Sequence, residues 1–477
     1  MTADTVKRPW VHVLVVASLA ALDAVLRLGR LHADEAFQML EPAFHRVYGY
    51  GVMTWEWDAT EGGIRNWAWA GIVVGALRLS DALGLAEPQA RRAIIELPLF
   101  ALHAGMLAAV FRLSARRVGE KLALWCVWLV GLYGPILWFA GRTMSESISA
   151  PLIVIALERL DVERRAAHAP LLAGMLLGLA EVFRYGSAAA ILFALLWLVG
   201  SRRFRDVGLV TLGGAVVAGA LGLLDAMTWG FSSLLRYVEF NLSSGRAAER
   251  FGADPWYYYF GWLLLPPWAV VGLARWKADV RARMWPLLIT GLGYMAVLLL
   301  TPHKERRFLY PTLVLLSVAG APAFVGWVKA LLDSPATVAR GKRLAAFGAL
   351  SVVVFFVFPC PYQPARGAQF RLASRAAREG HGLLLVNESQ GGWGGYFHLG
   401  KNIPVCVCVD LQDGCAQAAV GDPSFDRALT WDGRGLGALL DAGFSVEATQ
   451  GSATLLARHP SPEQAPLDRL DGGDSAG

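Results

Sequence analysis

Six titratable side chains lie close together directly after the first long apolar run of the chain. They fall in RLHADEAFQMLEPAFHRVYGYGVMTWEW, residues 30–57, and are His32, Asp34, Glu35, Glu41, His45 and Glu56. A carboxylate can act as a general base, which contributes about 10²–10⁴ in rate when it reaches the proton to be removed. Asp34 and Glu35 also suit the first turn of a helix, where acidic groups complement the helix dipole. The residue types therefore permit either acid–base chemistry or helix capping.

A second polar group is cationic and lies far along the chain. The stretch TPHKERRFLYP, residues 301–311, contains His303, Lys304, Arg306 and Arg307 where an apolar run ends. One well-aimed cation can stabilise a developing anionic leaving group by roughly 3–4 kcal/mol. The same pattern is typical of interfacial side chains that extend their charged ends to water. Arg142 and Glu146 leave a similar choice between binding an anion and pairing as helix neighbours.

Composition indicates which elements must hold these groups. The 477-residue chain is 55% hydrophobic, 17% charged, and has a mean hydropathy of +0.43. Apolar runs of about 18 to 22 residues recur along its first three quarters, and each can cross a bilayer. The formal charge of +6 sits mostly in short loops, without a basic arm, a zinc-finger spacing or a phosphate-binding glycine loop. We expect a multi-pass membrane protein with no nucleic-acid partner, no cofactor and no metal.

Loop charge sets the expected orientation. Lys7 and Arg8 precede a first apolar run that lacks a cleavage site, which predicts a retained helix and a cytoplasmic N-terminus. Cytoplasmic basic loops then give about eleven spans, near residues 10–28, 93–112, 121–140, 146–161, 169–184, 186–200, 207–224, 256–274, 284–301, 308–328 and 344–359. The run 66–85 breaks this parity, so we interpret it as a juxtamembrane segment of one large outer loop, residues 29–92. Both polar groups then lie on one face, outside the cytosol.

The C-terminal part differs in character. Residues 1–359 form the predicted membrane domain, whereas HGLLLVNES, IPVCVCV and ATLLARH are typical of strands and RGLGALLDAG of a helix. We therefore expect a small α/β outer domain at 360–459, followed by a disordered tail at 460–477. Disulfides persist outside the cytosol. Up to two can therefore form among Cys360, Cys406, Cys408 and Cys415, and the sequence leaves their pairing open.

The first outer loop opens with a helical pattern. Residues 34–47 place polar side chains on one face and apolar ones on another, the polar set being Asp34, Gln38, Glu41 and His45. This pattern predicts an amphipathic helix that can lie on the membrane surface. Four tryptophans follow, at positions 55, 57, 67 and 69. Such enrichment is typical of interfacial anchors, and it also suits a platform for a sugar ring.

Taken together, these motifs resemble glycosyltransferase family 22. HADEAFQMLEPAFHRVYGYGVMTWEW with Ile64-Arg65 is similar to the family's first luminal loop, and HKERRFLYP to its second hallmark; RTMSES, LDAMTW and FNLSSGRAAERFGADPWYYYF are weaker similarities. The chain departs from the pattern at Ala33, where Pro is usual, and at Glu146, where Asn is common. The resemblance implies a GT-C fold, meaning an all-α multi-pass membrane protein. It also implies inverting transfer of mannose from a dolichyl-type polyprenyl phosphate to a glycolipid or lipid-linked glycan, as in N-glycan and GPI-anchor assembly.

The resemblance further implies roles for single residues. An acidic residue of the first outer loop serves as base, with Asp34 the first choice and Glu35 the second. Because adjacent helical residues point about 100° apart, an equivalent pair of the kind used by retaining hydrolases is disfavoured. The donor phosphate would be bound by His303, Lys304, Arg307 and Arg142. The acceptor and sugar would be bound by His32, Gln38, Glu41, Trp55, Glu56, Trp57, Arg65 and Asp225. Glu181 and Arg184 are expected to form a structural pair.

A transporter or flippase of lipid-linked sugars is the alternative. Transporters place charged residues near the bilayer midplane within related repeats, whereas this chain concentrates charge on one face. The Ala, Arg and Gly bias favours a bacterial inner membrane with a periplasmic site; in a eukaryote the site would face the endoplasmic reticulum lumen. The linkage and the acceptor stay open.

Overall fold

The computed structural model describes residues 9–26, 32–161, 166–261, 265–275, 278–333, 367–387 and 393–458, together with positions 263, 341 and 348. It consists of two compact units, which are described separately. The helical unit falls within Met1–Arg27 and Asp34–Pro364, and the other within Leu28–Ala33 and Ala365–Gly477. The predicted span 344–359, apart from position 348, and the predicted tail 460–477 lie outside the described residues.

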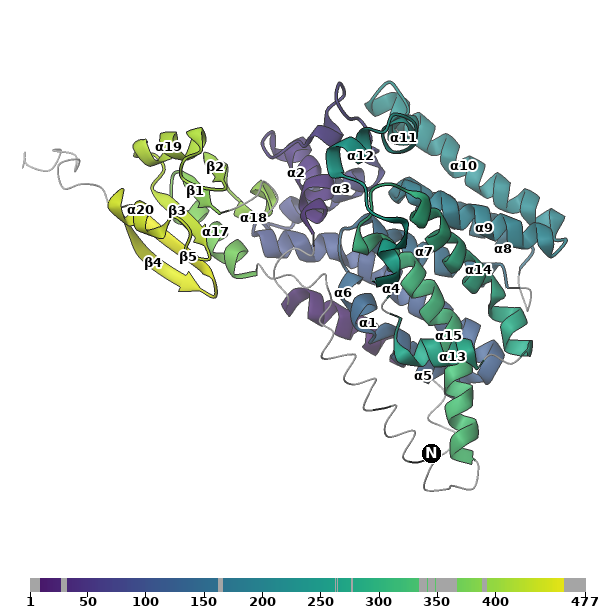
Figure 1. Ribbon diagram of the computed structural model, residues 1–477. Coiled ribbons are helices and arrows are strands. Elements are labelled where there is room, and N and C mark those ends of the chain that lie inside the picture. Colours follow the sequence, from purple (N-terminus) through teal and green to yellow (C-terminus); the bar gives the residue numbers. More distant parts are fainter. Residues whose placement is uncertain are drawn as a thin grey trace, which may run out of the picture. The chain divides into compact units, whose positions relative to one another are not determined.

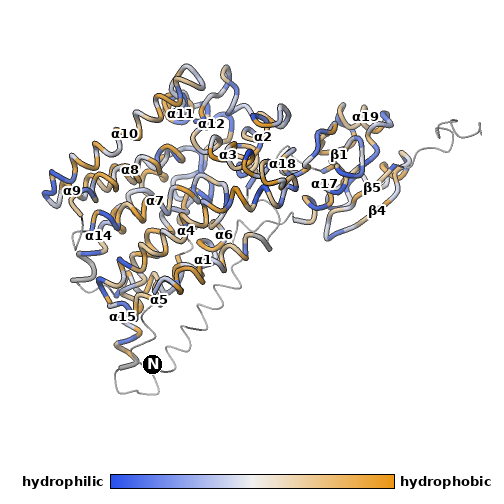
Figure 2. Tube along the Cα trace, turned by 180° about the vertical axis from the view of Figure 1, so that it is seen from behind, coloured by the Kyte–Doolittle hydropathy of each residue, from blue (hydrophilic) through white to orange (hydrophobic). Residues whose placement is uncertain are grey.

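Long apolar helices build the first unit (Figure 1). They are α1 (Pro9–Leu26), α4 (Pro88–Val118), α7 (Ser145–Arg159), α8 (Ala169–Phe183), α9 (Ala188–Gly200), α10 (Phe204–Thr228), α14 (Ala278–Leu300) and α15 (Tyr310–Asp333). Hydrophobic residues predominate along them (Figure 2). Within the described residues, four stretches are long and apolar enough to cross a membrane: 88–118, 204–228, 283–300 and 306–331. The count of about eleven spans therefore stays a prediction.

Two predicted spans are not continuous helices. Residues 121–140 form α5 (Glu120–Gly131) and α6 (Gly134–Phe139), with Pro135 in the first turn of α6. Residues 256–274 form a 3₁₀ helix (Trp256–Gly261) and α13 (Pro267–Ala274). Proline lacks a backbone N–H and disfavours helical geometry in the residue before it, which favours a break at both places.

Helix α8 packs closely against α7 and α10. Glycines permit the approach to α10, because a Cβ on Gly213 would lie 2.3 Å from the carbonyl oxygen of Leu171. A Cβ on Gly174 would likewise lie 2.1 Å from the carbonyl oxygen of Val210. Small residues commonly bring membrane helices together in this way. This packing fixes the C-terminal end of α8, which contributes to the site described below.

Residues 34–92 of the predicted outer loop are folded into the helical unit. They contain a π-helix (Glu35–Leu40), α2 (Glu41–Tyr48), a 3₁₀ turn (Trp55–Trp57) and α3 (Trp67–Ala82). A helix thus forms near residues 34–47, and half of its polar face, Gln38 and Glu41, is buried in the protein, while its position relative to the membrane surface stays a prediction. Every residue of the π-helix is buried, as are the first four residues of α2. Apolar side chains on several sides, including Ala36, Met39 and Ala43, explain the burial.

The C-terminal unit is a small α/β domain, as expected. Its elements are α17 (Gly367–Glu379), β1 (Leu383–Val386), α18 (Tyr396–Leu399), β2 (Val405–Cys408), α19 (Gly414–Gly421), β3 (Arg427–Trp431), α20 (Leu436–Asp441), β4 (Phe444–Gln450) and β5 (Ala453–Arg458). The strand order is β2-β1-β3-β5-β4, parallel through β3 and antiparallel beyond. One disulfide joins Cys406 to Cys415, and Cys408 is a buried free thiol. Cys360 lies outside the described residues.

Candidate active site

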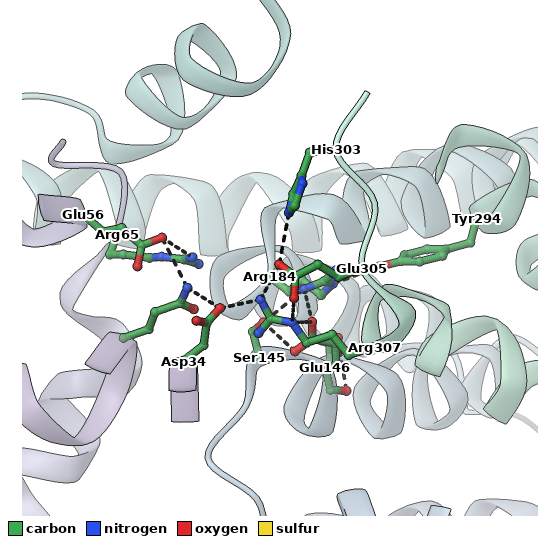
Figure 3. Close-up of polar contacts among 12 residues, drawn as sticks. Asp34, Glu56, Arg65, Ser145, Glu146, Arg184, Tyr294, His303, Glu305 and Arg307 are labelled. Atoms are coloured by element: carbon green, nitrogen blue, oxygen red, sulfur yellow. Dashed lines mark hydrogen bonds and ion pairs between the residues drawn. The ribbon is translucent and has the colours of Figure 1, made fainter. Parts of the chain in front are cut away.

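Asp34, at the start of the π-helix, and the stretch 303–307, called here the cationic turn, meet although they are far apart in sequence (Figure 3). Arg307 Nη2 donates a hydrogen bond to Asp34 Oδ2. The same guanidinium donates to both carboxylate oxygens of Glu305, from Nε to Oε2 at 2.7 Å and from Nη2 to Oε1 at 2.9 Å. Glu146 Oε1 lies 3.8 Å from Arg307 Nε. Such bidentate charged contacts are strong and directional. Arg307 therefore connects the segment of Asp34 to the segment of Glu305.

Both segments face a common cavity of about 430 Å³. Seven of the residues predicted to act in catalysis or binding line it: Asp34, Gln38, Trp55, Glu56, Arg65, His303 and Arg307. Glu181 and Arg184, expected to form a structural pair, line it as well. The rest of the wall is largely apolar or aromatic and includes Tyr237, Phe251 and Phe308. A concave apolar site with a few convergent polar groups is the usual form of a ligand-binding site. The cavity is therefore the candidate active site.

Gln38 links Asp34 to a second ion pair on the cavity wall. Its Nε2 donates to Asp34 Oδ2 at 2.5 Å and to Glu56 Oε1 at 3.2 Å. Arg65 Nη2 donates to Glu56 Oε1 at 2.7 Å. Burial raises the pKa of the Glu56 carboxyl, and the neighbouring charge of Arg65 offsets only part of this increase. The Gln38 amide therefore fixes the orientation of Asp34 with one N–H and donates the other to Glu56.

Glu305 is held as an anion in the cationic turn. Burial raises the pKa of its carboxyl, but the charge of Arg307 and hydrogen bonds from His303 and Arg307 outweigh this and lower the pKa to about 2. His303 Nε2 lies 3.2 Å from Glu305 Oε1. A carboxylate with charged hydrogen-bond donors on both sides stays ionised far into the acid range. Glu305 thus fixes Arg307 and His303 at the cavity wall.

This arrangement predicts a particular acid sensitivity. Because folding lowers the pKa of Glu305 from 4.5 to about 2, its contribution to stability is present above pH 4.5 and is lost as the pH falls to about 2. Replacement of Glu305 by Gln removes this titration. Between these pH values, the thermal unfolding midpoint of the wild type should fall more steeply than that of Glu305→Gln. Parallel curves for the two proteins would contradict the assignment.

An additional ion pair lies at the cavity wall and was not predicted from the sequence: Arg184 lines the cavity, whereas its partner Glu146 does not. Arg184 Nη1 contacts Glu146 Oε1 at 2.7 Å, and Arg184 Nε donates to the Tyr294 hydroxyl at 3.0 Å. The expected Glu181–Arg184 pair and the suggested Arg142–Glu146 pair are therefore both wrong. Arg184 follows the last residue of α8 in an extended conformation, with φ of −147°, so it is no longer a helix neighbour of Glu181.

Glu35 and Arg142 are placed together, away from the cavity lining. Glu35 Oε1 lies 3.6 Å from both Arg142 Nη1 and Arg92 Nη2. Arg92 in turn pairs with Glu96 at 2.6 Å. Neither Glu35 nor Arg142 lines the cavity, and they are 3% and 1% exposed. Arg142 therefore holds the π-helix in place rather than facing a phosphate.

The other predicted site residues brace the surrounding loops. Lys304 Nζ donates to the carbonyl oxygens of Thr301 and Asp254, and Glu41 Oε2 accepts from the N–H of Val52 at 2.8 Å. Asp225 Oδ2 accepts from the N–H and the hydroxyl of Ser233, at 2.8 and 2.7 Å. Trp57 is buried and lies 4.7 Å from Trp67, ring centre to ring centre. His32 is half-buried just before the helix and does not line the cavity.

Comparison with solved structures concerns the fold. ArnT from Cupriavidus metallidurans, bound to undecaprenyl phosphate, matches 95% of this chain and 100% of its own with a TM-score of 0.60 at 12% identity. Its structure in the apo state matches with a TM-score of 0.59. At this identity the likeness shows the fold alone, which is of the GT-C type.

Sequence comparison identifies the relatives. GPI mannosyltransferase 3 of Yarrowia lipolytica is 28% identical over 334 residues, which cover 67% of this chain and 63% of the relative. GPI alpha-1,2-mannosyltransferase 3 of Homo sapiens is 26% identical over 320 residues, 63% of this chain and 55% of the relative. The match thus spans less than two thirds of the length of either relative. The model of the Alg9-like mannosyltransferase family matches residues 10–375, which include both motifs, and the chain therefore belongs to the Alg9-like mannosyltransferase family.

Proposed function

We propose that the protein transfers mannose, with inversion, from a polyprenyl phosphate to a glycolipid or lipid-linked glycan on the non-cytosolic face of a membrane. The observation that carries this proposal is that Asp34 and Arg307 line one cavity of about 430 Å³. In a displacement at the anomeric carbon, a base removes the proton of the attacking hydroxyl and a cation stabilises the leaving phosphate. One cavity that contains both groups suits this reaction. The family match covers both segments.

Asp34 is the proposed base. Its carboxylate faces the cavity, whereas Glu35 is enclosed by Arg92 and Arg142. The acceptor hydroxyl transfers its proton to Asp34 Oδ as its oxygen bonds to the anomeric carbon. The bond from that carbon to the phosphate oxygen breaks on the opposite side, so the configuration inverts. Gln38 keeps the carboxylate oriented by its hydrogen bond of 2.5 Å.

Arg307 and His303 are the proposed ligands of the leaving phosphate. The guanidinium contacts Asp34 directly. An incoming lipid phosphate would exchange with Asp34 for this guanidinium, which leaves Asp34 free to accept a proton. Lys304 and Arg142 are removed from the proposed phosphate site because other groups hold their side chains. The revised set for the acceptor and sugar is Gln38, Trp55, Glu56 and Arg65, all of which line the cavity.

A transfer assay tests the proposal. Purified protein in lipid nanodiscs is incubated with polyprenyl phosphate mannose and mannose-terminated glycolipids, with the nucleotide sugar alone as a control donor. We expect a new mannose on the glycolipid only with the lipid-linked donor. The human relative's name includes an alpha-1,2 linkage, so that product is the first to be sought, and inversion then requires a β-linked donor. Movement of the lipid-linked sugar across the bilayer without transfer would instead support the flippase alternative.

A further inference from the structure

Glu181 is a cavity residue that the proposed reaction does not yet use. It lies in the last turn of α8 and lines the cavity together with Tyr185 and Tyr237. One of its carboxylate oxygens, Oε2, is buried and has no hydrogen-bond partner among the described residues. The backbone N–H of Ala188 provides one hydrogen bond to the carboxyl group. Glu181 thus lines the site and has one buried carboxylate oxygen that makes no hydrogen bond within the described residues.

The cation nearest in sequence is already engaged. Arg184 contacts Glu146 at 2.7 Å, the Tyr294 hydroxyl at 3.0 Å and the Ser145 hydroxyl at 3.2 Å. Arg184 makes these contacts through Nη1 and Nε, and the partners belong to α7 and α14. Glu181 therefore lacks the tight ion pair that usually accompanies an acidic group within a membrane bundle.

Only the backbone N–H of Ala188 and the charge of Arg184 favour this carboxylate, and burial outweighs both. It lies near the C-terminal end of α8, where the helix dipole disfavours negative charge. A buried polar group without a full set of hydrogen bonds costs free energy. Polar groups placed against stability are a common sign of binding sites. A ligand that donates hydrogen bonds would restore the missing contacts.

The remaining wall is suited to a ligand rich in hydroxyl groups. Three further cavity residues have a buried polar atom with no partner in the described part of the chain: Thr54 Oγ1, Arg65 Nε and His303 Nδ1. Together with Glu181 they supply both donors and acceptors, interspersed with aromatic side chains. Each hydroxyl of a hexose can both donate and accept hydrogen bonds, and the ring has a face that packs on aromatic groups.

We propose that Glu181 determines sugar specificity by accepting hydrogen bonds from hydroxyls of the hexose bound in the cavity. This inference rests on the transfer reaction proposed above. The hexose is either the donor mannose or the terminal sugar of the acceptor, and the chemistry of recognition is the same for both. Glu181 is thus assigned to binding, while Asp34 carries out the proton transfer.

A panel of monodeoxy sugars tests the assignment. Donors and acceptors that each lack one hydroxyl are assayed with the wild type and with Glu181→Met, whose side chain has a similar shape but no strong acceptor. In the wild type, loss of the contacted hydroxyl should lower kcat/KM by about 10- to 100-fold, as expected for a hydrogen bond to a charged group. In Glu181→Met the intact sugar should suffer the same loss, and removal of that hydroxyl should have no further effect. Whether the sensitive analogue is a donor or an acceptor identifies the sugar.

Two further variants separate recognition from folding. Glu181→Gln keeps one acceptor oxygen and should recover part of the discrimination. Glu61→Gln changes an exposed carboxylate outside the cavity lining and should behave as the wild type. The thermal midpoint of Glu181→Met should be equal to or above that of the wild type. Equal discrimination by Glu181→Met and the wild type would overturn the inference, as would a lowered midpoint with a uniform loss for every sugar. Absence of transfer by the wild type would instead refute the proposed function.

Discussion

Replacement of Asp34 by Asn is expected to lower the rate of mannose transfer by about 10²–10⁴, the usual contribution of a general base. Asn keeps the shape of the side chain and an oxygen that can accept from Arg307 and Gln38, so the fold should be retained. It cannot accept the proton of the acceptor hydroxyl at neutral pH. The measurement is kcat for transfer, with the thermal midpoint recorded in parallel. The loss should fall on kcat rather than on the KM for either substrate.

Glu35 provides the matched control. Glu35→Gln removes the neighbouring carboxylate but leaves the cavity unchanged, because Glu35 contacts Arg92 and Arg142 instead. Its loss leaves two buried guanidinium groups short of a counter-charge, which costs stability. We therefore expect a lowered thermal midpoint with most of kcat retained in the folded fraction. The reverse result, a normal rate for Asp34→Asn and an inactive but stable Glu35→Gln, would transfer the role of base to Glu35.

Replacement of Arg307 by Gln is expected to lower transfer by about 10²–10³, which is typical for loss of one donor to a developing charge. Arg307→Lys should recover only part of this, because an ammonium group cannot hold two oxygens in one plane. The effect should appear both in kcat and in the binding of a free polyprenyl phosphate, measured by displacement of a labelled lipid.

Two controls accompany this prediction. Arg306→Gln changes the adjacent cation, which does not line the cavity, and should leave transfer unchanged. Loss of Arg307 also leaves Asp34 and Glu305 without their shared partner, so rates are compared only for the folded fraction. If Arg307→Gln bound the lipid phosphate as tightly as the wild type, the leaving group would have to be held elsewhere.

The sequence predicted the meeting of the two motifs but not its local geometry. The separation of Asp34 and Glu35 on a helix correctly indicated that they have different environments. Their sequence alone could not decide which one faces the cavity, because the answer depends on the buried pair Arg92 and Arg142. The π-helix at Glu35–Leu40 was also not predictable. Insertion of an extra residue into a helical turn depends on packing of the surrounding helices, and it leaves no periodic signal.

Charged residues far apart in sequence were the hardest to pair. The i, i+3 spacing of Glu181 and Arg184 favoured a local pair, whereas α8 ends between them and Arg184 reaches Glu146 on α7. Lys304 matched a phosphate-binding pattern, yet nearby backbone carbonyls of its own loop hold its ammonium group. Composition and motif thus placed charges on the correct segments, but partner choice required the tertiary structure.

The most direct test of the central claim is a cryo-electron microscopy structure of the protein with a non-cleavable phosphonate analogue of polyprenyl phosphate mannose. We predict that the phosphonate oxygens contact Arg307 and His303, that the sugar occupies the cavity next to Asp34, and that the contact between Arg307 and Asp34 is broken. A bound analogue whose phosphonate contacts neither cation, or whose sugar lies outside this cavity, would contradict the account.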